Sequence, residues 1–135
     1  MGSERGGHAL GPDDRRRPAV IRRGAIHLVD LDPVVGAESN KTRPAIVISN
    51  DAANSAAMRH GHGVVTVVPV TSAIDRVYPF QVFLTAADSG LDVDSKAQAE
   101  QIRAVDVSRF GARVGAVASA GLEELEEAIR LHLAL

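Results

Sequence analysis

The sequence predicts a mainly β fold, a small and strongly bent barrel closed by one amphipathic C-terminal helix. Two observations carry this prediction. The apolar residues up to Val117 fall into five or six short runs rich in Val and Ile, separated by turn residues. Only the last stretch has apolar residues at helical spacing. Because strands this short would leave open edges in a flat sheet, a barrel is the expected arrangement.

Six apolar runs account for the expected strands. The loop between the first two spans residues 34–42, where no regular period is present. Pro69, inside the most apolar run, indicates an edge strand or a bulge near the end of that strand. We expect strands at Ala25–Leu31, Pro44–Ser49, Val64–Val70, Phe80–Leu84, Lys96–Val105 and Val114–Val117, and a short helical turn at Asp51–Met58.

The C-terminal stretch differs in kind. Leu122, Leu125, Ile129 and Leu133 recur at helical spacing, with glutamates on the other faces. Ser119 is the expected N-cap, and acidic residues in the early turns suit the helix dipole. These features predict one amphipathic helix.

The composition bounds the class of protein. A chain of 135 residues with 45% hydrophobic and 24% charged residues suits one globular domain. The absence of cysteine excludes disulfides and thiolate metal sites and is compatible with a reducing cytoplasm. No apolar run approaches the roughly 18 residues of a membrane span, and the N-terminus lacks a signal-peptide pattern. We therefore expect a cytoplasmic protein with no membrane partner.

The net charge of -2 hides an uneven distribution. Residues 1–23 carry six Arg against three acidic residues, whereas the rest of the chain carries nine Lys or Arg against fourteen Asp or Glu. A globular part this acidic is not a general nucleic-acid coat, so a polyanion would bind at a local cluster built on Lys41 and Arg43. We expect residues 1–22 to be a disordered leader or tag and residues 23–135 to form one domain.

Two strand ends carry candidate chemistry. Pro44 restricts Arg43 to an extended conformation and so holds it at the mouth of a rigid strand, on a loop. Thr71 ends another apolar run, and if the two strands are neighbours the two side chains converge on one pocket. A guanidinium can neutralise a phosphodiester and its developing charge, and a hydroxyl can relay a proton, without a metal. Glu38 could serve as a base or orient the arginine.

Simpler interpretations stay open for each of these residues. Arg43 could be a surface charge, Thr71 a turn hydroxyl that bonds its own backbone, and Glu38 a solvated loop carboxylate. His60 and His62 are flanked by glycine and lack a Glu or Cys at ligand spacing, which favours a turn over a metal site. Serine-hydrolase, phosphate-loop and dinucleotide patterns are absent, so we expect no metal and no cofactor.

Short motifs occur in a fixed order between about Arg22 and Leu135. They are Arg23-Gly24, Leu28–Pro33, Gly36–Glu38, Thr42–Asn50, Val68–Ser72 and Glu100–Arg103, followed by a Leu-His-Leu-Ala-Leu ending. Each motif is weak alone, but together they resemble the MazF/PemK family of toxin endoribonucleases, and the ending is similar to that of actinobacterial members.

The resemblance implies an SH3-like barrel of the MazF/PemK/CcdB type and a homodimer, with single-stranded RNA lying across the subunit interface. It implies metal-independent, sequence-specific cleavage of mRNA, with rRNA or tRNA as further candidates, which inhibits translation and growth. The ribose 2′-hydroxyl attacks the adjacent phosphate and leaves 2′,3′-cyclic phosphate and 5′-hydroxyl ends. A MazE-like antitoxin, encoded alongside, would cover the RNA groove with an extended acidic segment.

The family's catalytic arginine and threonine fall on Arg43 and Thr71. By resemblance, Arg43 stabilises transition-state charge and could protonate the leaving oxygen, while Thr71 contacts the scissile phosphate; Glu38 completes the catalytic candidates. Gln101 and Arg103 bind RNA or hold the barrel and dimer together. The RNA-binding candidates are Lys41, Thr42, Ser72, Gln101 and Arg103.

Two positions depart from the family pattern. Ala25 and His27 stand where members often have an acidic residue and a bulky aromatic. The histidine puts the cleavage motif in doubt more than the activity, and it could join the proton chemistry because its unperturbed pKa is about 6.5. Asp30 and Asp32 match a family motif, and we expect them to have a structural role at the end of the first strand.

The fold alone does not settle the function. A non-catalytic toxin of the same fold that poisons DNA gyrase would need no Arg43, Thr71 and Glu38 set and would act through the region of the C-terminal helix. A degenerate member that binds RNA without cutting it is a further alternative.

Overall fold

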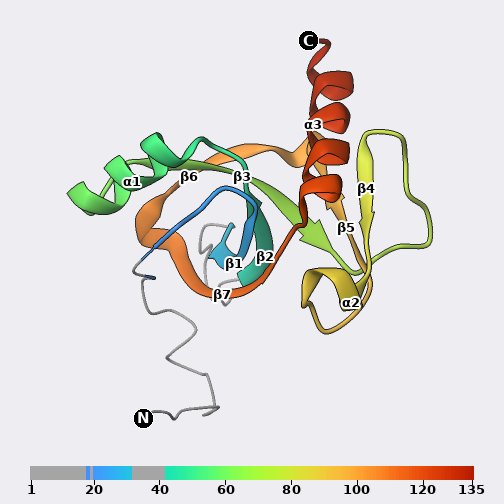
Figure 1. Ribbon diagram of the computed structural model, residues 1–135, viewed down its shortest axis with the longest axis horizontal. Helices are drawn as coiled ribbons and strands as arrows, with labels where there is room; N and C mark the ends of the chain where they lie inside the picture. Colours follow the sequence, from blue (N-terminus) through green and yellow to red (C-terminus); the bar gives the residue numbers. More distant parts are fainter. Residues whose placement is uncertain (1–17, 19, 32–41) are drawn as a thin grey trace, which may run out of the picture.

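The computed structural model describes residues 18, 20–31 and 42–135. Their strands form one antiparallel sheet in the order β4-β5-β3-β2-β1-β7, and β6 pairs with β3 off this path (Figure 1). The strands are β1 (Ala25–Asp30), β2 (Thr42–Val47), β3 (Val64–Thr71), β4 (Gln81–Leu84), β5 (Ser95–Gln98), β6 (Arg103–Asp106) and β7 (Phe110–Ala116). The helices are α1 (Asp51–His60), α2 (Ala86–Ser89) and α3 (Ser119–Leu133), with the short 3-10 turns η2 (Ala99–Gln101) and η3 (Val107–Arg109).

Five strands surround one hydrophobic core. The order β6-β3-β2-β1-β7 follows the pairing, and η3 joins the two outer strands directly in the chain. Each strand contributes a buried apolar side chain, namely Val105, Val67, Val47, Val29 and Phe110. Although no continuous ladder closes this sheet in the described residues, the arrangement around one core confirms the expected barrel-like, mainly β fold.

A second core lies on the other face of the central strands. Ile26, Ile46 and Val68 point to it, alternating along their strands with the residues of the first core. Leu125, 1% exposed, and Ala128 bring α3 onto this face. Figure 1 shows α3 standing beside β4, at the opposite end of the molecule from α1. Because β1, β2 and β3 are buried on both faces, their sequences read as nearly continuous apolar runs.

Several element boundaries differ from the sequence prediction. The single strand expected over 96–105 is wrong, because β5 ends at Gln98 and β6 begins at Arg103 after the turn η2. The last strand, β7, begins at Phe110, four residues earlier than expected. The N-cap of α3 is Ala118, one residue before the expected Ser119, and its side chain makes no capping bond. The short helix α2 was not predicted.

Pro69 lies in a central strand, so the edge position predicted for it is wrong. The Thr66 carbonyl accepts a hydrogen bond from the Ile48 N–H, on the side of β3 that faces β2. By alternation the nitrogen of Pro69 faces the other side. There the pairing with β6 ends at Val67 and the pairing with β5 begins at Val70. Pro69 lies where β3 changes from one partner strand to the other. No hydrogen bond from its nitrogen is needed there, so the missing N–H costs the sheet nothing.

The folded part begins before residue 23. Ile21 is 3% exposed and lies in the first core. Residues 1–17 and 19 lie outside the described residues, so a disordered leader there stays a prediction. In the part of the chain that the structure describes, no helix is long and apolar enough to cross a membrane.

Candidate functional site

The ends of three neighbouring strands place Thr71 between two cations. Its Cα partner on β5 is Lys96. On the other side, the pairing of β2 with β3 ends at Ala45 and Pro69. We extend this register by two residues along both strands, which brings Arg43 opposite Thr71. Cross-strand partners project from the same face of a sheet. We call Arg43, Thr71 and Lys96 the strand-end row.

A cleft of about 510 Å³ borders this row. Its apolar wall comes from β1, β2, β3 and β7, through Leu28, Pro44, Val70 and Val114. Pro44 and Ser95 line the cleft, so alternation directs the residues next to them, Arg43 and Lys96, to the other side. Thr71, as the last residue of β3, borders both. The remaining lining residues are Ser72, Gly90, Leu91, Asp92, Val93 and Ser95.

Arg43 lies inside β2 and not on the preceding loop, which corrects the sequence prediction. Pro44 next to it holds extended backbone, so the strand simply begins two residues earlier, at Thr42. The Arg43 side chain is exposed and has no ion pair with any residue that the structure describes. An exposed guanidinium without a fixed partner is available to an incoming anion.

The Thr71 hydroxyl bonds the turn that follows β3, and its expected contact with a phosphate stays a prediction. Its Oγ1 accepts a hydrogen bond from the Ala73 N–H at 3.2 Å, so the simpler interpretation as a turn hydroxyl is confirmed. A hydroxyl that accepts one bond still has its own proton to donate. The turn therefore fixes the orientation of Thr71 and leaves it able to donate to a phosphate oxygen.

Lys96 is a candidate that the sequence analysis missed. It is only 8% exposed, and its Nζ donates to the Arg76 carbonyl at 2.6 Å. The same Nζ lies 5.9 Å from the centroid of the Tyr78 ring, a cation–π distance. Lys96 thus adds positive charge beside Thr71 and anchors the connection between β3 and β4. The available signal was a lysine at the start of a run that the sequence predicts to be a strand.

A glutamate and a glutamine also anchor that connection. The Gln81 Nε2 donates to the Glu100 carboxylate at 2.8 Å, and the Gln81 Oε1 accepts from the Tyr78 N–H at 3.1 Å. The Glu100 side chain therefore joins η2 to the start of β4. The sequence analysis quoted Glu100 only as part of a motif.

The remaining RNA-binding candidates divide into two places. Thr42 begins β2 beside Arg43, and Ser72 lines the cleft. Gln101 and Arg103 are exposed, and neither lines the cleft. Arg103 pairs with Val67, four residues before the end of β3. That separation corresponds to roughly 13 Å along the strand.

Three of the predicted residues fall outside the description. Glu38, Lys41 and Asp32 lie among the residues that the structure does not describe, so their roles stay predictions. Asp30 ends β1, and its carbonyl accepts a bond from the Arg109 guanidinium at 3.4 Å. Because this contact uses only the backbone, the structural role expected for the Asp30 side chain stays a prediction.

His27 is a buried side chain on the other face of β1 from the cleft. It is 1% exposed, its Nδ1 lies 3.1 Å from the Gly111 carbonyl, and its ring meets the edge of Phe110 at 5.6 Å. Because a carbonyl only accepts, Nδ1 carries the proton of the neutral ring. Burial lowers the pKa of His27, against the opposing effect of the Gly111 hydrogen bond. His27 does not line the cleft, so it is not placed to join the proton chemistry there.

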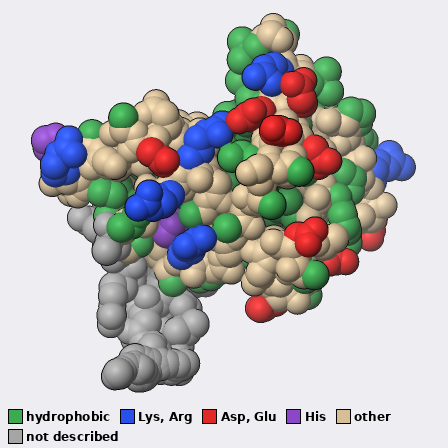
Figure 2. Space-filling model, in the orientation of Figure 1, with side chains coloured by type: hydrophobic (Ala, Val, Ile, Leu, Met, Phe, Trp, Pro, Cys, Tyr) green, Lys and Arg blue, Asp and Glu red, His purple; other side chains and the backbone are tan. Residues whose placement is uncertain are grey.

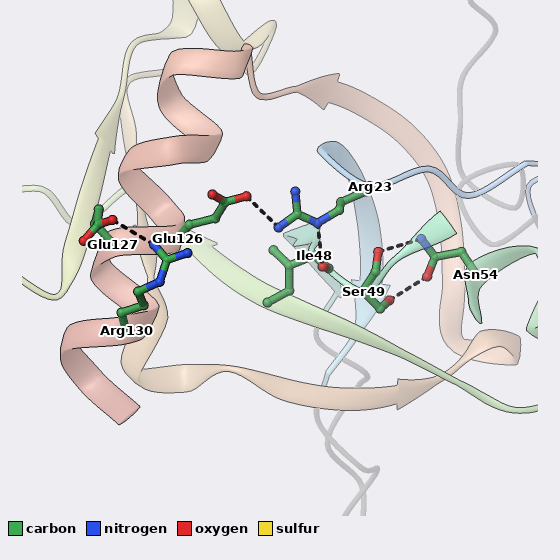
Figure 3. Close-up of polar contacts among 7 residues, drawn as sticks. All are labelled: Arg23, Ile48, Ser49, Asn54, Glu126, Glu127 and Arg130. Atoms are coloured by element: carbon green, nitrogen blue, oxygen red, sulfur yellow. Dashed lines mark hydrogen bonds and ion pairs between the residues drawn. The ribbon is translucent and has the colours of Figure 1, made fainter. Parts of the chain in front are cut away.

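Arg23 holds the start of β1 against two other elements (Figure 3). Its Nε donates to the Ile48 carbonyl at 2.9 Å, and one terminal nitrogen forms an ion pair with Glu126 of α3, also at 2.9 Å. Its backbone N–H donates to the Asp51 carboxylate at 2.7 Å. This hydrogen bond is the main cause of the lowered pKa of Asp51. Arg23, in the motif Arg23-Gly24, therefore has a structural role: it ties the start of β1 to the end of β2 and to α3.

Ser49 and Asn54 form a second anchor at the start of α1 (Figure 3). Asn54 is fully buried; its Nδ2 donates to the Ser49 carbonyl at 3.0 Å, and its Oδ1 accepts from the Ser49 hydroxyl at 2.5 Å. The Ser49 Oγ in turn accepts from the Thr66 N–H of β3 at 3.0 Å. Asn50 caps α1 by accepting from the Ala53 N–H at 2.8 Å.

Metal ligands are not clustered in the described part of the chain. No group of three or more His, Cys, Asp or Glu side chains is placed there to hold a metal ion. His60 and His62 have ring centroids 6.3 Å apart, at the end of α1 and in the turn after it.

Comparison with known proteins identifies the family. Residues 22–133 match the family described as PemK-like, MazF-like toxin of type II toxin–antitoxin system. The chain is 57% identical to the endoribonuclease MazF9 of Mycobacterium tuberculosis, over 86% of this chain and 98% of that protein. It is 31% identical to the endoribonuclease EndoA of Bacillus subtilis, over 86% and 97%. A MazE–MazF crystal structure from Deinococcus radiodurans superposes with a TM-score of 0.71 and 27% identity, over 86% and 97%. The chain belongs to the PemK-like, MazF-like family of type II toxin–antitoxin toxins.

Proposed function

We propose that this chain is a sequence-specific, metal-independent endoribonuclease that cleaves single-stranded RNA. The observation that carries the proposal is the strand-end row, in which Thr71 lies between Arg43 and Lys96 at the border of an apolar cleft. The names of the relatives MazF9 and EndoA, both endoribonucleases, support the same reaction class.

The row suits cleavage by the neighbouring ribose. The 2′-oxygen attacks phosphorus, the bond from phosphorus to the 5′-oxygen breaks, and the products carry 2′,3′-cyclic phosphate and 5′-hydroxyl ends. Negative charge grows on the non-bridging oxygens in the transition state, where the Arg43 guanidinium can bind two of them. Thr71 donates its proton to a phosphate oxygen, and the buried Lys96 adds to the local positive potential. Arg43 also protonates the leaving oxygen, and Glu38 is proposed as the base that takes the 2′-hydroxyl proton.

The cleft beside the row is proposed to hold a base next to the scissile phosphate. Its volume of about 510 Å³ and its largely aliphatic wall fit a small planar ligand. Ser72 and Asp92 at the cleft provide the polar groups that could read a base edge. Lys41 and Thr42 would bind the adjoining backbone, and Gln101 and Arg103 would contact RNA farther along.

The physiological setting follows from the family. A MazE–MazF structure is among the solved neighbours, and we propose that a MazE-like antitoxin with an acidic segment covers the strand-end row. We propose further that the chain acts as a homodimer and that cleavage of mRNA inhibits translation and growth.

The decisive experiment is cleavage of a long mixed-sequence RNA in EDTA, followed by end-group analysis. We expect discrete fragments with cyclic phosphate and 5′-hydroxyl ends. Arg43→Ala should reduce the cleavage rate by about 10²–10³-fold, as loss of a transition-state charge partner does. Arg130→Ala on α3 removes the same charge far from the row and should cleave like the parent.

Three outcomes would contradict the proposal in different ways. An unchanged rate in Arg43→Ala would overturn the assignment of that residue. RNA that stays bound but uncut by the folded parent protein would favour a degenerate member. RNA that is neither bound nor cut would favour a non-catalytic toxin, and DNA gyrase would then be the partner to test.

A further inference from the structure

A second basic pocket lies at the start of β1 and shares no lining residue with the cleft. It has a volume of about 390 Å³ and is lined by Arg22, Arg23, His27 and Arg113, together with five small or aliphatic residues. None of the described residues that line it is acidic. Figure 2 shows several basic side chains to the left of α3, with an acidic side chain among them.

The charges in this pocket are only partly balanced. Arg23 is paired with Glu126 at 2.9 Å. Arg22 and Arg113 have no ion pair with any residue that the structure describes, and the Arg113 Nε donates only to the Gly115 carbonyl at 3.3 Å. Arg22 is partly balanced by the Asp51 carboxylate, whose pKa it helps to lower. Arg113 has no such carboxylate among the described ion pairs.

The pocket also contains an unsatisfied buried nitrogen. The Nε2 of His27 is inaccessible to solvent and has no hydrogen-bond partner among the residues that the structure describes, while Nδ1 is held by the Gly111 carbonyl. Among the described residues, the charged side chains that line the pocket with this ring are Arg22, Arg23 and Arg113, all positive, and Arg113 acts on the ring directly. An unpaired polar atom in such a place is unfavourable unless a ligand supplies the missing partner.

We propose that this pocket binds a phosphate group, which Arg22 and Arg113 grip while His27 closes the inner wall. Guanidinium forks match phosphate oxygens and would find their counter-charge there. A bound phosphate would add negative charge beside the arginines. This charge favours the protonated imidazolium form of His27, in which both ring nitrogens can donate a hydrogen bond. The phosphate can belong to an RNA strand or to a free phosphomonoester, and the pocket does not depend on the cleavage proposal.

A titration with inorganic phosphate at constant ionic strength tests the pocket, with the His27 ring resonances followed by NMR. We expect a saturable shift of these resonances and a rise of the His27 pKa when phosphate is bound. The double change Arg22→Gln and Arg113→Gln should weaken binding by about tenfold or more. Arg130→Gln, which removes a charge on α3, should bind like the parent.

Two results would overturn the proposal. The first is a parent protein in which the His27 resonances do not respond to phosphate. The second is an equal response in the double variant, with its fold verified by circular dichroism, because a response without the two arginines cannot come from this grip.

The source of the phosphate is decided by a second titration with an uncleavable 2′-O-methyl oligonucleotide, with and without a 5′-phosphate. A His27 response to both forms assigns a backbone phosphate, and a response to the phosphorylated form alone assigns a terminal one. A response to inorganic phosphate but to neither oligonucleotide assigns a free phosphomonoester. Because His27 reports the binding, this result is independent of whether the protein cleaves RNA.

Discussion

Replacing Asn54 by Asp changes one buried donor into an acceptor without changing the shape of the side chain. In the parent, the Asn54 Nδ2 donates to the Ser49 carbonyl at 3.0 Å and to the Asp51 carboxylate at 3.3 Å. In Asn54→Asp an oxygen faces both of these acceptors. The new carboxylate therefore loses its hydrogen bonds there and meets a negative charge.

The size of the effect follows from these distances. Leaving the buried Ser49 carbonyl unsatisfied costs about 1–3 kcal/mol. Repulsion from Asp51 at 3.3 Å would reach about 5 kcal/mol at an effective dielectric constant of about 20, and less because Asp51 faces solvent. The new carboxyl can avoid the repulsion by staying protonated in the folded protein. Keeping a carboxyl with an ordinary pKa of about 3.9 protonated at pH 7 costs about 4 kcal/mol, so the total destabilisation cannot exceed this value by much. We expect a loss of about 3–4 kcal/mol at pH 7.

The pH dependence has a definite sign. The new carboxyl has a raised pKa in the folded state, so its destabilisation appears as the pH rises through the unfolded value of about 3.9. At pH 4.5, keeping the same carboxyl protonated costs only about 1 kcal/mol, so the destabilisation is limited to about that value. Asn54→Ala is the control, because it removes the same bonds without adding a titrating group.

Urea denaturation followed by circular dichroism, at pH 7 and at pH 4.5 and at one protein concentration, measures both effects. We expect the deficit of Asn54→Asp to shrink by about 2 kcal/mol or more at the lower pH, while that of Asn54→Ala stays constant. Equal deficits of Asn54→Asp at the two pH values would refute the reasoning.

Four further predictions concern packing and burial. Gly115→Ala places a Cβ against the Ser89 carbonyl oxygen and should destabilise the fold by about 1–3 kcal/mol, measured by thermal unfolding. Gly121→Ala in α3 places a Cβ 2.9 Å from the Val117 Cγ1, a side-chain methyl and not backbone, and its gain in helix propensity of about 1 kcal/mol should make its loss smaller than that of Gly115→Ala; equal losses in both variants would contradict this difference. Leu125→Ala should cost about 2–5 kcal/mol in urea unfolding, and a loss below 1 kcal/mol would mean that α3 is not packed as described. In an NMR titration without phosphate, the midpoint for His27 should lie below its ordinary value of about 6.5, and fold stability should decrease as the pH falls through that range; half-protonation at or above pH 6.5 would contradict its burial.

The elements that the sequence predicted best are those whose pattern is set locally. The expected strand Val64–Val70 and the observed β3, Val64–Thr71, differ by one residue. The helical spacing of Leu122 and Leu125 likewise predicted the helix that is observed as α3. In both cases the element packs apolar residues against a core, so the period is visible in the residue types alone.

The break between β5 and β6 could not be found in the same way. Residues 99–102 contain neither Gly nor Pro, and their apolar residues continue the pattern of a strand. The break arises because β5 and β6 pair with different parts of β3. Long-range packing decides which part of β3 each strand pairs with, and a local sequence pattern does not contain that information. The role of Lys96 was missed for the same reason, since only the pairing of β5 with β3 brings it to Thr71.

The change of partner along β3 also explains why Thr71 has a cation on each side. β3 pairs with β6 through Val67 and with β5 from Val70 onward, so its last residue is flanked by β2 and β5. Had the ladder with β6 continued, the neighbour of Thr71 would have been a residue before Arg103, and Lys96 would lie elsewhere. Pro69 sits between the two ladders and has no N–H that would favour extending either of them. The proline of the Pro-x-Thr-Ser stretch thus contributes to the site through backbone pairing, although its own side chain takes no part in the chemistry.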